Sequence, residues 1–307
     1  MWDLIIIGGA CAGLVAGIFA GRKKINTLIL TEKVGGQALL TDNIENFPGF
    51  KKISGRELIQ KITKQVEDLK VPIREGREVV KIQKEKEHFK VITQDGEQFE
   101  AKTLIIATGK HPRPLNIPGE RKLRGKGVSY CSICDAPLFK NKNVAVIGGG
   151  NAGLEAGLDL TQYAKKIYIL EWGPRIVGDQ VLQEKLRKTK KVEFIVNAKS
   201  LEIKGEKWVQ ALIYEDRVSR VKKELSLEGI FINIGQIPSS DFVKDFLAIN
   251  SQGEIIIDPK TNQTSVPGIF AAGDVTDVKW KQCIVAAGEG AKALLSAYTY
   301  LQKFKKV

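Results

Sequence analysis

Two cysteines separated by two residues form the most chemically informative pattern in the chain. Cys131 and Cys134 stand where a helical turn is expected to begin, and Asp135 follows directly. A pair with this spacing can close a small disulfide, and the amides of a helix N-terminus stabilise a thiolate. A structural zinc ion needs four ligands, and the other cysteines and both histidines are not paired at ligand spacing. The pattern favours a redox pair, and we expect no metal site.

Asp135 and the two remaining cysteines each admit a chemical and a structural interpretation. The Asp135 carboxylate could hand a proton to a leaving thiolate, or it could complement the helix dipole in the first turn. We favour the proton role because a dithiol that exchanges electrons needs a proton source. Cys11 and Cys283 are interpreted as packed side chains and not as a second redox centre.

An internal repeat indicates the elements that position these groups. Residues 3–7 form an apolar run that ends in the glycine-rich segment 8–13, and residues 144–147 lead likewise into segment 148–153. A stretch of helical character follows each glycine segment. This succession of strand, glycine turn and helix is typical of dinucleotide binding, in which the pyrophosphate lies at the helix N-terminus.

Each copy of the repeat then reaches a second apolar strand that closes on an acid. Glu32 lies 24 residues after Gly8, and Glu171 lies 23 residues after Gly148. At this spacing a carboxylate accepts hydrogen bonds from an adenosine ribose. One glycine fingerprint is weak evidence, but two with matching strands and acids predict two dinucleotide sites.

Later segments extend the repeat and suggest how the chain is divided. Strands over 104–106 and 230–232 are each followed by a glycine and an exit proline, and the alternating stretches 89–93 and 208–214 predict small antiparallel sheets. A third glycine segment, 268–274, precedes a helix expected over 282–304, and Ser54 with Glu57 predicts a capped helix over 56–69.

These observations predict an α/β protein with two Rossmann-like, three-layer β/β/α nucleotide-binding domains. We expect the second domain to be inserted in the first. The first domain would comprise residues 1–114 and 240–307, and the inserted domain, with the Cys-x-x-Cys pair, residues 115–239.

Composition excludes several other classes of protein. The chain has 307 residues, of which 43% are hydrophobic and 27% charged, and only four are cysteines, which favours a globular cytoplasmic protein over a disulfide scaffold. The net charge of +13 is spread over scattered lysine pairs without a nucleic-acid-binding motif, so we expect no nucleic acid partner. The uncharged run 4–21 is interrupted by glycines and lacks preceding basic residues, so we expect neither a signal peptide nor membrane insertion.

The motifs stand in the order found in low-molecular-weight thioredoxin reductases, and the chain resembles that family over essentially its whole length. The segments that carry the resemblance are 8–13, 35–37, 45–49, 107–109, 131–135, 148–153 and 272–274. The resemblance implies FAD in the first domain, a nicotinamide dinucleotide in the inserted domain, a redox disulfide, a homodimer and rotation of one domain against the other.

The resemblance also implies which residues bind the cofactors. For FAD these are Gly8, Ala10, Gly13, Glu32, Gly36, Gln37, Asn46, Thr108, Gly109, Gly273, Asp274 and Gln282. For the nicotinamide dinucleotide they are Gly148, Gly150, Asn151, Gly153 and Glu171. The first fingerprint departs from the family pattern at Ala10, which replaces the middle glycine, and at Cys11, where proline is common.

The cofactor preference is suggested by a second departure. NADPH-dependent members carry a His-Arg-Arg-x-x-x-Arg cluster after the second strand of this domain, whereas this chain has Glu171 there and only Arg175 nearby. A carboxylate binds a free 2′-hydroxyl and repels a 2′-phosphate, so we expect NADH, with NADPH less favoured.

Residues 148–171, 178–180 and 288–293 resemble even more the reductase core of the flavoprotein subunit of alkyl hydroperoxide reductase, which also uses NADH. Because the chain starts at the first fingerprint, we expect the electrons to leave to a separate protein.

We predict a thioredoxin-disulfide reductase that passes electrons from NADH through FAD and the Cys131/Cys134 disulfide to a thioredoxin- or glutaredoxin-like protein. The alternatives are an NADH oxidase, a reductase of a peroxidase system, a ferredoxin-dependent thioredoxin reductase, and a flavin-binding sensor or scaffold without turnover.

Overall fold

The computed structural model describes residues 1–40 and 44–303, and the chain divides into two compact units. The first unit comprises Met1–His111 and Ile237–Val307, and the second comprises Pro112–Gln236. The chain passes between them through β7 (Lys110–Pro112) and β16 (Gln236–Pro238), which pair as a two-stranded sheet. Both crossings lie three residues before the expected positions. The assignment of one cofactor to each unit stays a prediction.

The first unit is built on a seven-stranded sheet in the order β3-β2-β1-β6-β5-β4, with β17 also paired to β6. Its strands are β1 (Trp2–Ile7), β2 (Thr27–Thr31), β3 (Ile73–Glu75), β4 (Val79–Lys84), β5 (Phe89–Thr93), β6 (Gln98–Ile106) and β17 (Ile269–Ala271). The antiparallel strands β4 and β5 continue this sheet and do not form a separate one. The nine-residue β6 allows this, because residues 98–101 pair with β5 while residues 101–106 pair with β1.

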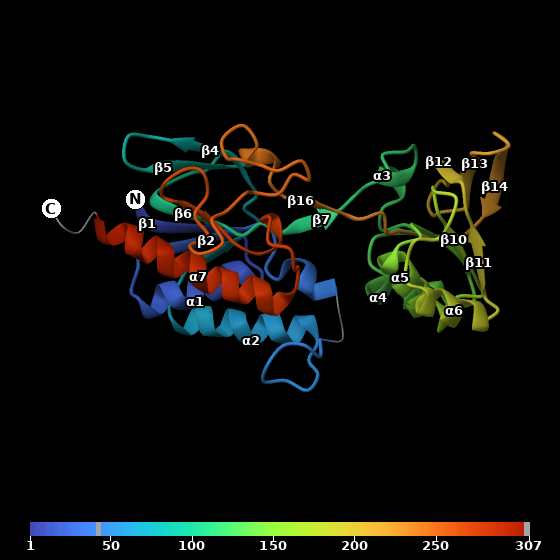
Figure 1. Cartoon of the computed structure of the whole chain (residues 1–307), viewed down its shortest axis with the longest axis horizontal. Coiled ribbons are helices and arrows are strands. Elements are labelled where there is room, and N and C mark those ends of the chain that lie inside the picture. The colour runs from blue at the N-terminus through green and yellow to red at the C-terminus, as the bar shows by residue number, and fades with distance from the viewer. Residues whose placement is uncertain (41–43, 304–307) are drawn as a thin grey trace. The chain divides into compact units, whose positions relative to one another are not determined.

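Three helices cover one face of this sheet (Figure 1): α1 (Cys11–Arg22), α2 (Gly55–Asp68) and α7 (Cys283–Gln302). Leu4 and Ile6 of β1 pack in the apolar cluster on the helical face, while Ile5 and Ile7 pack in the cluster on the opposite face. Burial on both faces explains why β1 is a continuous apolar run. Short helical turns η1 (Gly36–Leu40), η3 (Asp241–Val243) and η4 (Gly273–Val275) complete the unit.

Two helices were predicted with bounds close to those observed. The Ser54 hydroxyl accepts a hydrogen bond from the Glu57 amide at 3.1 Å, which confirms the expected cap, and the helix then runs over residues 55–68. Helix α7 starts one residue after the expected position, with Gln282 as its N-cap. The last residue of the expected range 282–304 lies outside the described residues.

The second unit has a parallel sheet in the order β11-β10-β9-β15-β8 and a separate antiparallel sheet, β12-β13-β14. The strands are β8 (Val128–Ser129), β9 (Asn143–Ile147), β10 (Lys166–Leu170), β11 (Val192–Ile195), β12 (Ala198–Lys204), β13 (Ala211–Asp216), β14 (Lys222–Ser226) and β15 (Gly229–Ile232). The helices are α3 (Glu120–Leu123), α4 (Ser132–Asp135), η2 (Ala136–Phe139), α5 (Asn151–Thr161) and α6 (Gln180–Lys188).

Side chains of β9 place the parallel sheet between two other layers. Val144 and Val146 pack with residues of α5 and α6, whereas Ala145 and Ile147 pack with residues of the antiparallel sheet. The stretch 208–214 was expected to lie in an antiparallel sheet, and β13 confirms this for residues 211–214, but residues 208–210 precede the strand. The Trp208 indole instead donates a hydrogen bond to the Glu228 carbonyl at 2.7 Å.

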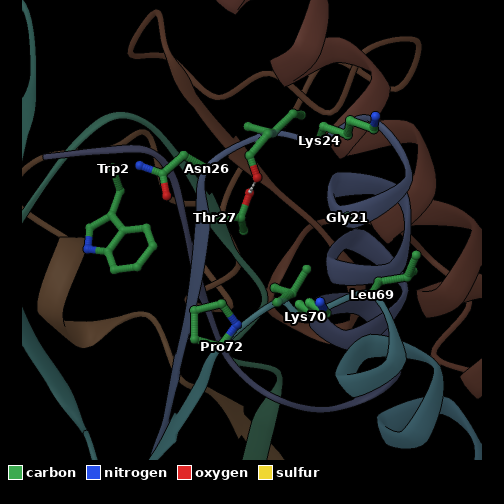
Figure 2. Close-up of a pocket in the computed structure, with 10 residues that line it drawn as sticks. Trp2, Gly21, Lys24, Asn26, Thr27, Leu69, Lys70 and Pro72 are labelled. Carbon is green, nitrogen blue, oxygen red and sulfur yellow. Dashed lines mark hydrogen bonds between the residues drawn. The ribbon is translucent and has the colours of Figure 1, made fainter.

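Figure 2 shows a pocket in the first unit that lies at the amino ends of the strands. Trp2, Thr27 and Pro72 line it at the starts of β1, β2 and β3, together with Lys24 and Lys70. Ligands of parallel α/β sheets bind outside the carboxyl ends of the strands. We therefore place the candidate site at the other edge. Within the described ranges, no helix is both long enough and apolar enough to cross a membrane.

Candidate functional site

The two cysteines of the Cys-x-x-Cys pair form a disulfide at the start of α4. Cys131 is the N-cap of this helix, as predicted, and its sulfur accepts a hydrogen bond from the Cys134 amide at 3.2 Å. Cys134 is exposed and Cys131 is half-buried. A disulfide at a helix N-terminus, open to solvent, can exchange with thiols of another molecule.

Two carboxylates lie close to this disulfide in the chain or in space. Asp135 is half-buried, and its amide donates to the Cys131 carbonyl at 3.3 Å. Asp159, on α5, accepts a hydrogen bond at 2.7 Å from the hydroxyl of Ser132, which lies between the two cysteines in the sequence. Burial raises the pKa of Asp159, while the bond from Ser132 lowers it. Sequence reasoning missed Asp159 because only the packing of α4 on α5 brings it here.

Glu120 joins the segment that enters the second unit to Tyr130, the residue before the disulfide. It is 4% exposed and accepts hydrogen bonds from the Leu115 amide at 2.9 Å and the Asn116 amide at 2.6 Å. The Tyr130 hydroxyl donates to the same carboxylate. Burial, followed by this bond to Glu120, raises the pKa of Tyr130. Tyr130 precedes Cys131, so this network fixes the backbone at the disulfide.

The first glycine turn packs so closely that its glycines leave no room for a side chain. Gly8 follows β1 with φ +117°, and a Cβ placed on it would lie 2.2 Å from the Ala107 carbonyl oxygen. A Cβ on Gly13 would lie 1.9 Å from the Gly8 carbonyl oxygen. Ala10 is the N-cap of α1, and its Cβ would lie 3.1 Å from a Cβ on Gly36. The turn presents the first amides of α1 at the carboxyl end of β1, and amides in this arrangement can bind a pyrophosphate.

The second glycine turn has the same geometry. Gly148 has φ +119° and would place a Cβ 2.2 Å from the Asn233 carbonyl oxygen, and Gly153 would place one 1.9 Å from the Gly148 carbonyl oxygen. Gly150 is the N-cap of α5, as Ala10 is of α1. The repeat seen in the sequence is therefore a repeat of backbone geometry.

The two acids that end the second strands differ in their surroundings. Glu32 follows β2 and is exposed. The Glu171 carboxylate is held by two backbone amides, from Gly149 at 2.7 Å and from Gly173 at 2.8 Å. Because one bond goes to each of its oxygens, the orientation of Glu171 is fixed at the mouth of the second glycine turn.

The structure brings two predicted FAD residues from distant segments together. The Asn46 amide donates to the Gln282 side chain at 3.1 Å, and Gln282 caps α7. Gly273, with φ +78°, starts η4, where a Cβ would lie 3.1 Å from that of Ala12 on α1. Burial raises the pKa of the neighbouring Asp274, whereas the positive charges of Lys281 and Lys110 lower it. The glycine turn, η4 and the start of α7 thus meet in the first unit.

Three other residues that were predicted to bind FAD form hydrogen bonds within the protein. The Gln37 amide donates to the Lys110 carbonyl at 2.6 Å, and the Thr108 hydroxyl donates to the Ser239 carbonyl at 2.7 Å. Gly109 has φ +69° and accepts from the Ser239 amide at 2.9 Å. These bonds fasten the two crossing segments to the first unit.

In the second unit, Asn151 is paired with Asp179. The Asn151 amide donates to the Asp179 carboxylate at 3.0 Å, and the Asp179 backbone amide donates to the Asn151 oxygen at 2.7 Å. The Asn233 Nδ2, beside Gly148, is buried and has no hydrogen-bond partner among the described residues. An unpaired buried donor next to a glycine turn fits a polar ligand.

Both glycine turns therefore fit the pyrophosphate of a dinucleotide, because each tight turn brings the start of a helix to the carboxyl end of a strand. For a metal ion the outcome differs: in the part of the chain that the structure describes, no three His, Cys, Asp or Glu side chains are grouped to hold one.

Known proteins are similar to this chain over nearly its whole length. The sequence model of the family described as pyridine nucleotide-disulphide oxidoreductase matches residues 2–290. Over 300 residues the chain is 43% identical to an alkyl hydroperoxide reductase subunit of Staphylococcus aureus strain MRSA252, a match that covers 98% of this chain and 59% of that protein. The corresponding protein of Escherichia coli K12 is 43% identical over 308 residues, or 99% of this chain and 59% of that protein.

Among solved structures, Lactococcus lactis thioredoxin reductase in its FR conformation matches with a TM-score of 0.87 and 36% identity, covering 99% of this chain and 100% of that one. These similarities confirm the predicted resemblance and the fold with two Rossmann-like domains. The chain spans about three-fifths of the length of the curated relatives it matches, 59% in each case.

Proposed function

Because the chain belongs to the pyridine nucleotide-disulphide oxidoreductase family, we propose that it is a flavin-dependent disulfide reductase that carries electrons from NADH to a thioredoxin- or glutaredoxin-like protein. The observation that carries this proposal is the Cys131–Cys134 disulfide at the exposed start of α4. The similarity to a protein named thioredoxin reductase supports a protein disulfide as the substrate.

The family implies FAD and a pyridine nucleotide as cofactors. Bound FAD would supply the transfer of an electron pair from a reduced nicotinamide to a disulfide. In the first unit, Gly8 and Gly13 allow the tight turn that would bring the amides of α1 to its pyrophosphate, and Glu32 would bind its ribose. Asp274 and Gln282 are proposed as further contacts.

The reduced thiols would act in sequence on the partner. We assign the attack to Cys131, because the hydrogen bond that the Cys134 amide donates to its sulfur would stabilise a thiolate there. Attack on the partner's disulfide forms a mixed disulfide and releases one partner thiolate, which takes up a proton. Cys134 then attacks the Cys131 sulfur, restores the internal disulfide and releases the second partner thiol. Two electrons leave the chain, and Asp135 is proposed to supply a proton to the leaving thiolate.

Single cysteine variants test this assignment. Cys131→Ser is expected to leave reduction of the flavin by NADH intact and to abolish turnover with a disulfide protein. Cys134→Ser is expected to trap the partner as a stable mixed disulfide on Cys131, seen by mass spectrometry. Trapping by the Cys131 variant instead would reverse the two roles, and full turnover by that variant would refute the proposed function.

The glycine repeat offers a matched pair of variants for the cofactor assignment. Gly13→Ala and Gly153→Ala introduce the same 1.9 Å clash with a carbonyl oxygen in different units. We expect Gly13→Ala to lower the amount of FAD that the protein binds, measured by flavin absorbance. We expect Gly153→Ala to weaken nucleotide binding while the protein retains FAD. The opposite outcome would exchange the cofactors between the units.

NADH is proposed as the preferred reductant because the Glu171 carboxylate is fixed where a ribose is expected to bind. Stopped-flow reduction of the flavin with NADH and NADPH side by side tests this preference. Loss of a hydrogen bond to a charged group costs about 1.5–3 kcal/mol, so Glu171→Gln should weaken NADH binding by about ten- to a hundredfold. A strong preference of the unmodified protein for NADPH would contradict the role of Glu171.

A second candidate is a reductase of a peroxidase system, favoured by the identity to proteins named as alkyl hydroperoxide reductase subunits. In that case the thiols would reduce the disulfide of a peroxidase module and not that of a general thioredoxin. NADH consumption with each purified disulfide protein, under anaerobic conditions, separates the two. Oxygen consumption without either partner would instead indicate an NADH oxidase. We also propose a homodimer, which light scattering tests.

A further inference from the structure

Asn233 directly follows β15 and lies beside the second glycine turn. Its backbone amide donates to the Ile147 carbonyl at 2.8 Å, and a Cβ on Gly148 would lie 2.2 Å from the Asn233 carbonyl oxygen. The side chain is partly exposed, but its Nδ2 is buried and has no hydrogen-bond partner in the part of the chain that the structure describes. An unpaired buried donor lowers stability, and a ligand that accepts a hydrogen bond from it recovers that loss.

The internal repeat has Ala107 at the equivalent position of the first unit. The Ala107 amide donates to the Ile7 carbonyl at 2.7 Å, and a Cβ on Gly8 would lie 2.2 Å from the Ala107 carbonyl oxygen. The backbones of Asn233 and Ala107 therefore make the same contacts, while Ala107 has only a methyl group, which is buried in the apolar cluster of the helical face. The packing of a glycine turn thus does not require an amide side chain at this position.

The order of the strands indicates which half of a dinucleotide Asn233 can reach. In the parallel sheet, β9 lies between β10 and β15. The glycine turn follows β9, Glu171 follows β10 and Asn233 follows β15, so all three lie at the carboxyl ends of adjacent strands. A dinucleotide with its pyrophosphate at the glycine turn extends to both sides of β9. If the adenosine ribose lies at Glu171, as proposed above, the nicotinamide half extends towards Asn233.

We propose that the Asn233 side chain donates a hydrogen bond to a hydroxyl of the ribose that bears the nicotinamide. This inference rests on the proposed function, because it requires a nicotinamide dinucleotide in the second unit. The contact of Asn233 with Gly148 favours this ribose, since it is the group next to the pyrophosphate, over the nicotinamide ring beyond it. Rotation about the Cβ–Cγ bond exchanges the positions of Nδ2 and Oδ1, so the amide can present its donor to a ligand while the backbone stays in place.

Three nucleotides that differ by one group at a time test this contact in the flavin-loaded protein. ADP ends at the pyrophosphate, ADP-ribose adds the second ribose, and NAD⁺ adds the nicotinamide. Removal of one neutral hydrogen bond should weaken the binding of ADP-ribose and of NAD⁺ to Asn233→Ala by about three- to tenfold. The binding of ADP should be unchanged. Isothermal titration calorimetry measures all three affinities without turnover.

Glu171→Gln is the matched control, because its proposed contact is with the adenosine ribose, which all three nucleotides share. This control variant should weaken all three. Thermal unfolding without nucleotide gives a second readout. Asn233→Ala removes an unpaired buried donor and introduces the residue of the first unit, so its melting temperature should equal or exceed that of the unmodified protein. A lower melting temperature would contradict the unpaired state of the amide.

The pattern of affinities decides between the possible roles of Asn233. Equal weakening of ADP and ADP-ribose would overturn the contact with the second ribose, and weakening of NAD⁺ alone would move the contact to the nicotinamide. Unchanged binding of all three to Asn233→Ala would refute the contact but not the proposed function. If the unmodified protein bound none of the three, the proposed function would fail and this contact with it.

Discussion

Replacement of Glu254 by glutamine should destabilise the first unit in a way that depends on pH. The Glu254 side chain is 9% exposed and forms ion pairs with Lys110 at 2.9 Å and Lys281 at 3.0 Å. Asn250 donates a further hydrogen bond at 2.9 Å. Lys110 belongs to the crossing strand β7 and Lys281 precedes the cap of α7, so the cluster holds two segments of the candidate site in place.

The magnitude follows from the pKa of Glu254. Burial raises this pKa, but the hydrogen bonds from Asn250, Lys110 and Lys281 outweigh burial and lower it from 4.5 to about 2. At about 1.4 kcal/mol per tenfold change, this corresponds to about 3 kcal/mol. Because both ammonium groups retain some contact with solvent, we reduce this to about 2 kcal/mol.

The sign of the pH dependence follows from the lowered pKa. The carboxylate stabilises the folded state fully above pH 4.5, and this contribution is lost as the pH falls through about 2. Glu254→Gln should therefore lower the free energy of unfolding by about 2 kcal/mol at pH 7 and by less than about 1 kcal/mol at pH 3.

Urea unfolding, read by hydrogen exchange of peptides from the first unit, measures the effect at both pH values. The control is Asp68→Asn, which removes a largely exposed ion pair to Lys64 on α2 and should leave the free energy of unfolding nearly unchanged. An equal loss in the Glu254 variant at pH 7 and pH 3 would refute the electrostatic origin. No loss at either pH would show that the cluster does not stabilise the unit.

Three further predictions concern the second unit. Glu120→Gln should destabilise it by about 2–3 kcal/mol in thermal unfolding, because one carbonyl oxygen cannot replace a carboxylate that accepts three hydrogen bonds; an unchanged melting temperature would contradict this. Asp159→Asn should stabilise the second unit by less than about 1 kcal/mol at pH 7, because burial raises the pKa of Asp159, and this gain should vanish at acidic pH. Ser132→Ala, which removes the hydrogen bond to Asp159, should destabilise the unit. Gly119→Ala, at φ +87°, would place a Cβ 1.9 Å from the Ile203 carbonyl oxygen and should lower the free energy of unfolding by more than about 2 kcal/mol. The control Gly125→Ala, at φ +71° in open space, should lower it by about 1 kcal/mol. Equal losses in the two variants would argue against the clash.

The parts of the site that were predictable are those fixed by local backbone requirements. A glycine turn between a buried strand and a helix needs φ near +117° at Gly8 and +119° at Gly148, a backbone conformation that residues with a Cβ rarely adopt. The sequence therefore records such turns directly. The start of α4 at Cys131 and the cap of α2 at Ser54 were predictable for the same reason, since helix caps are local.

Contacts between distant segments were not predictable from one sequence. The bond from Ser132 to Asp159 depends on how α4 packs against α5, and the bond from Asn46 to Gln282 joins segments that are 236 residues apart. Strand alternation predicted antiparallel pairing over residues 89–93 but could not show that β6 would join it to the parallel sheet. Periodicity reports which face of a strand is buried and carries no information about its partners.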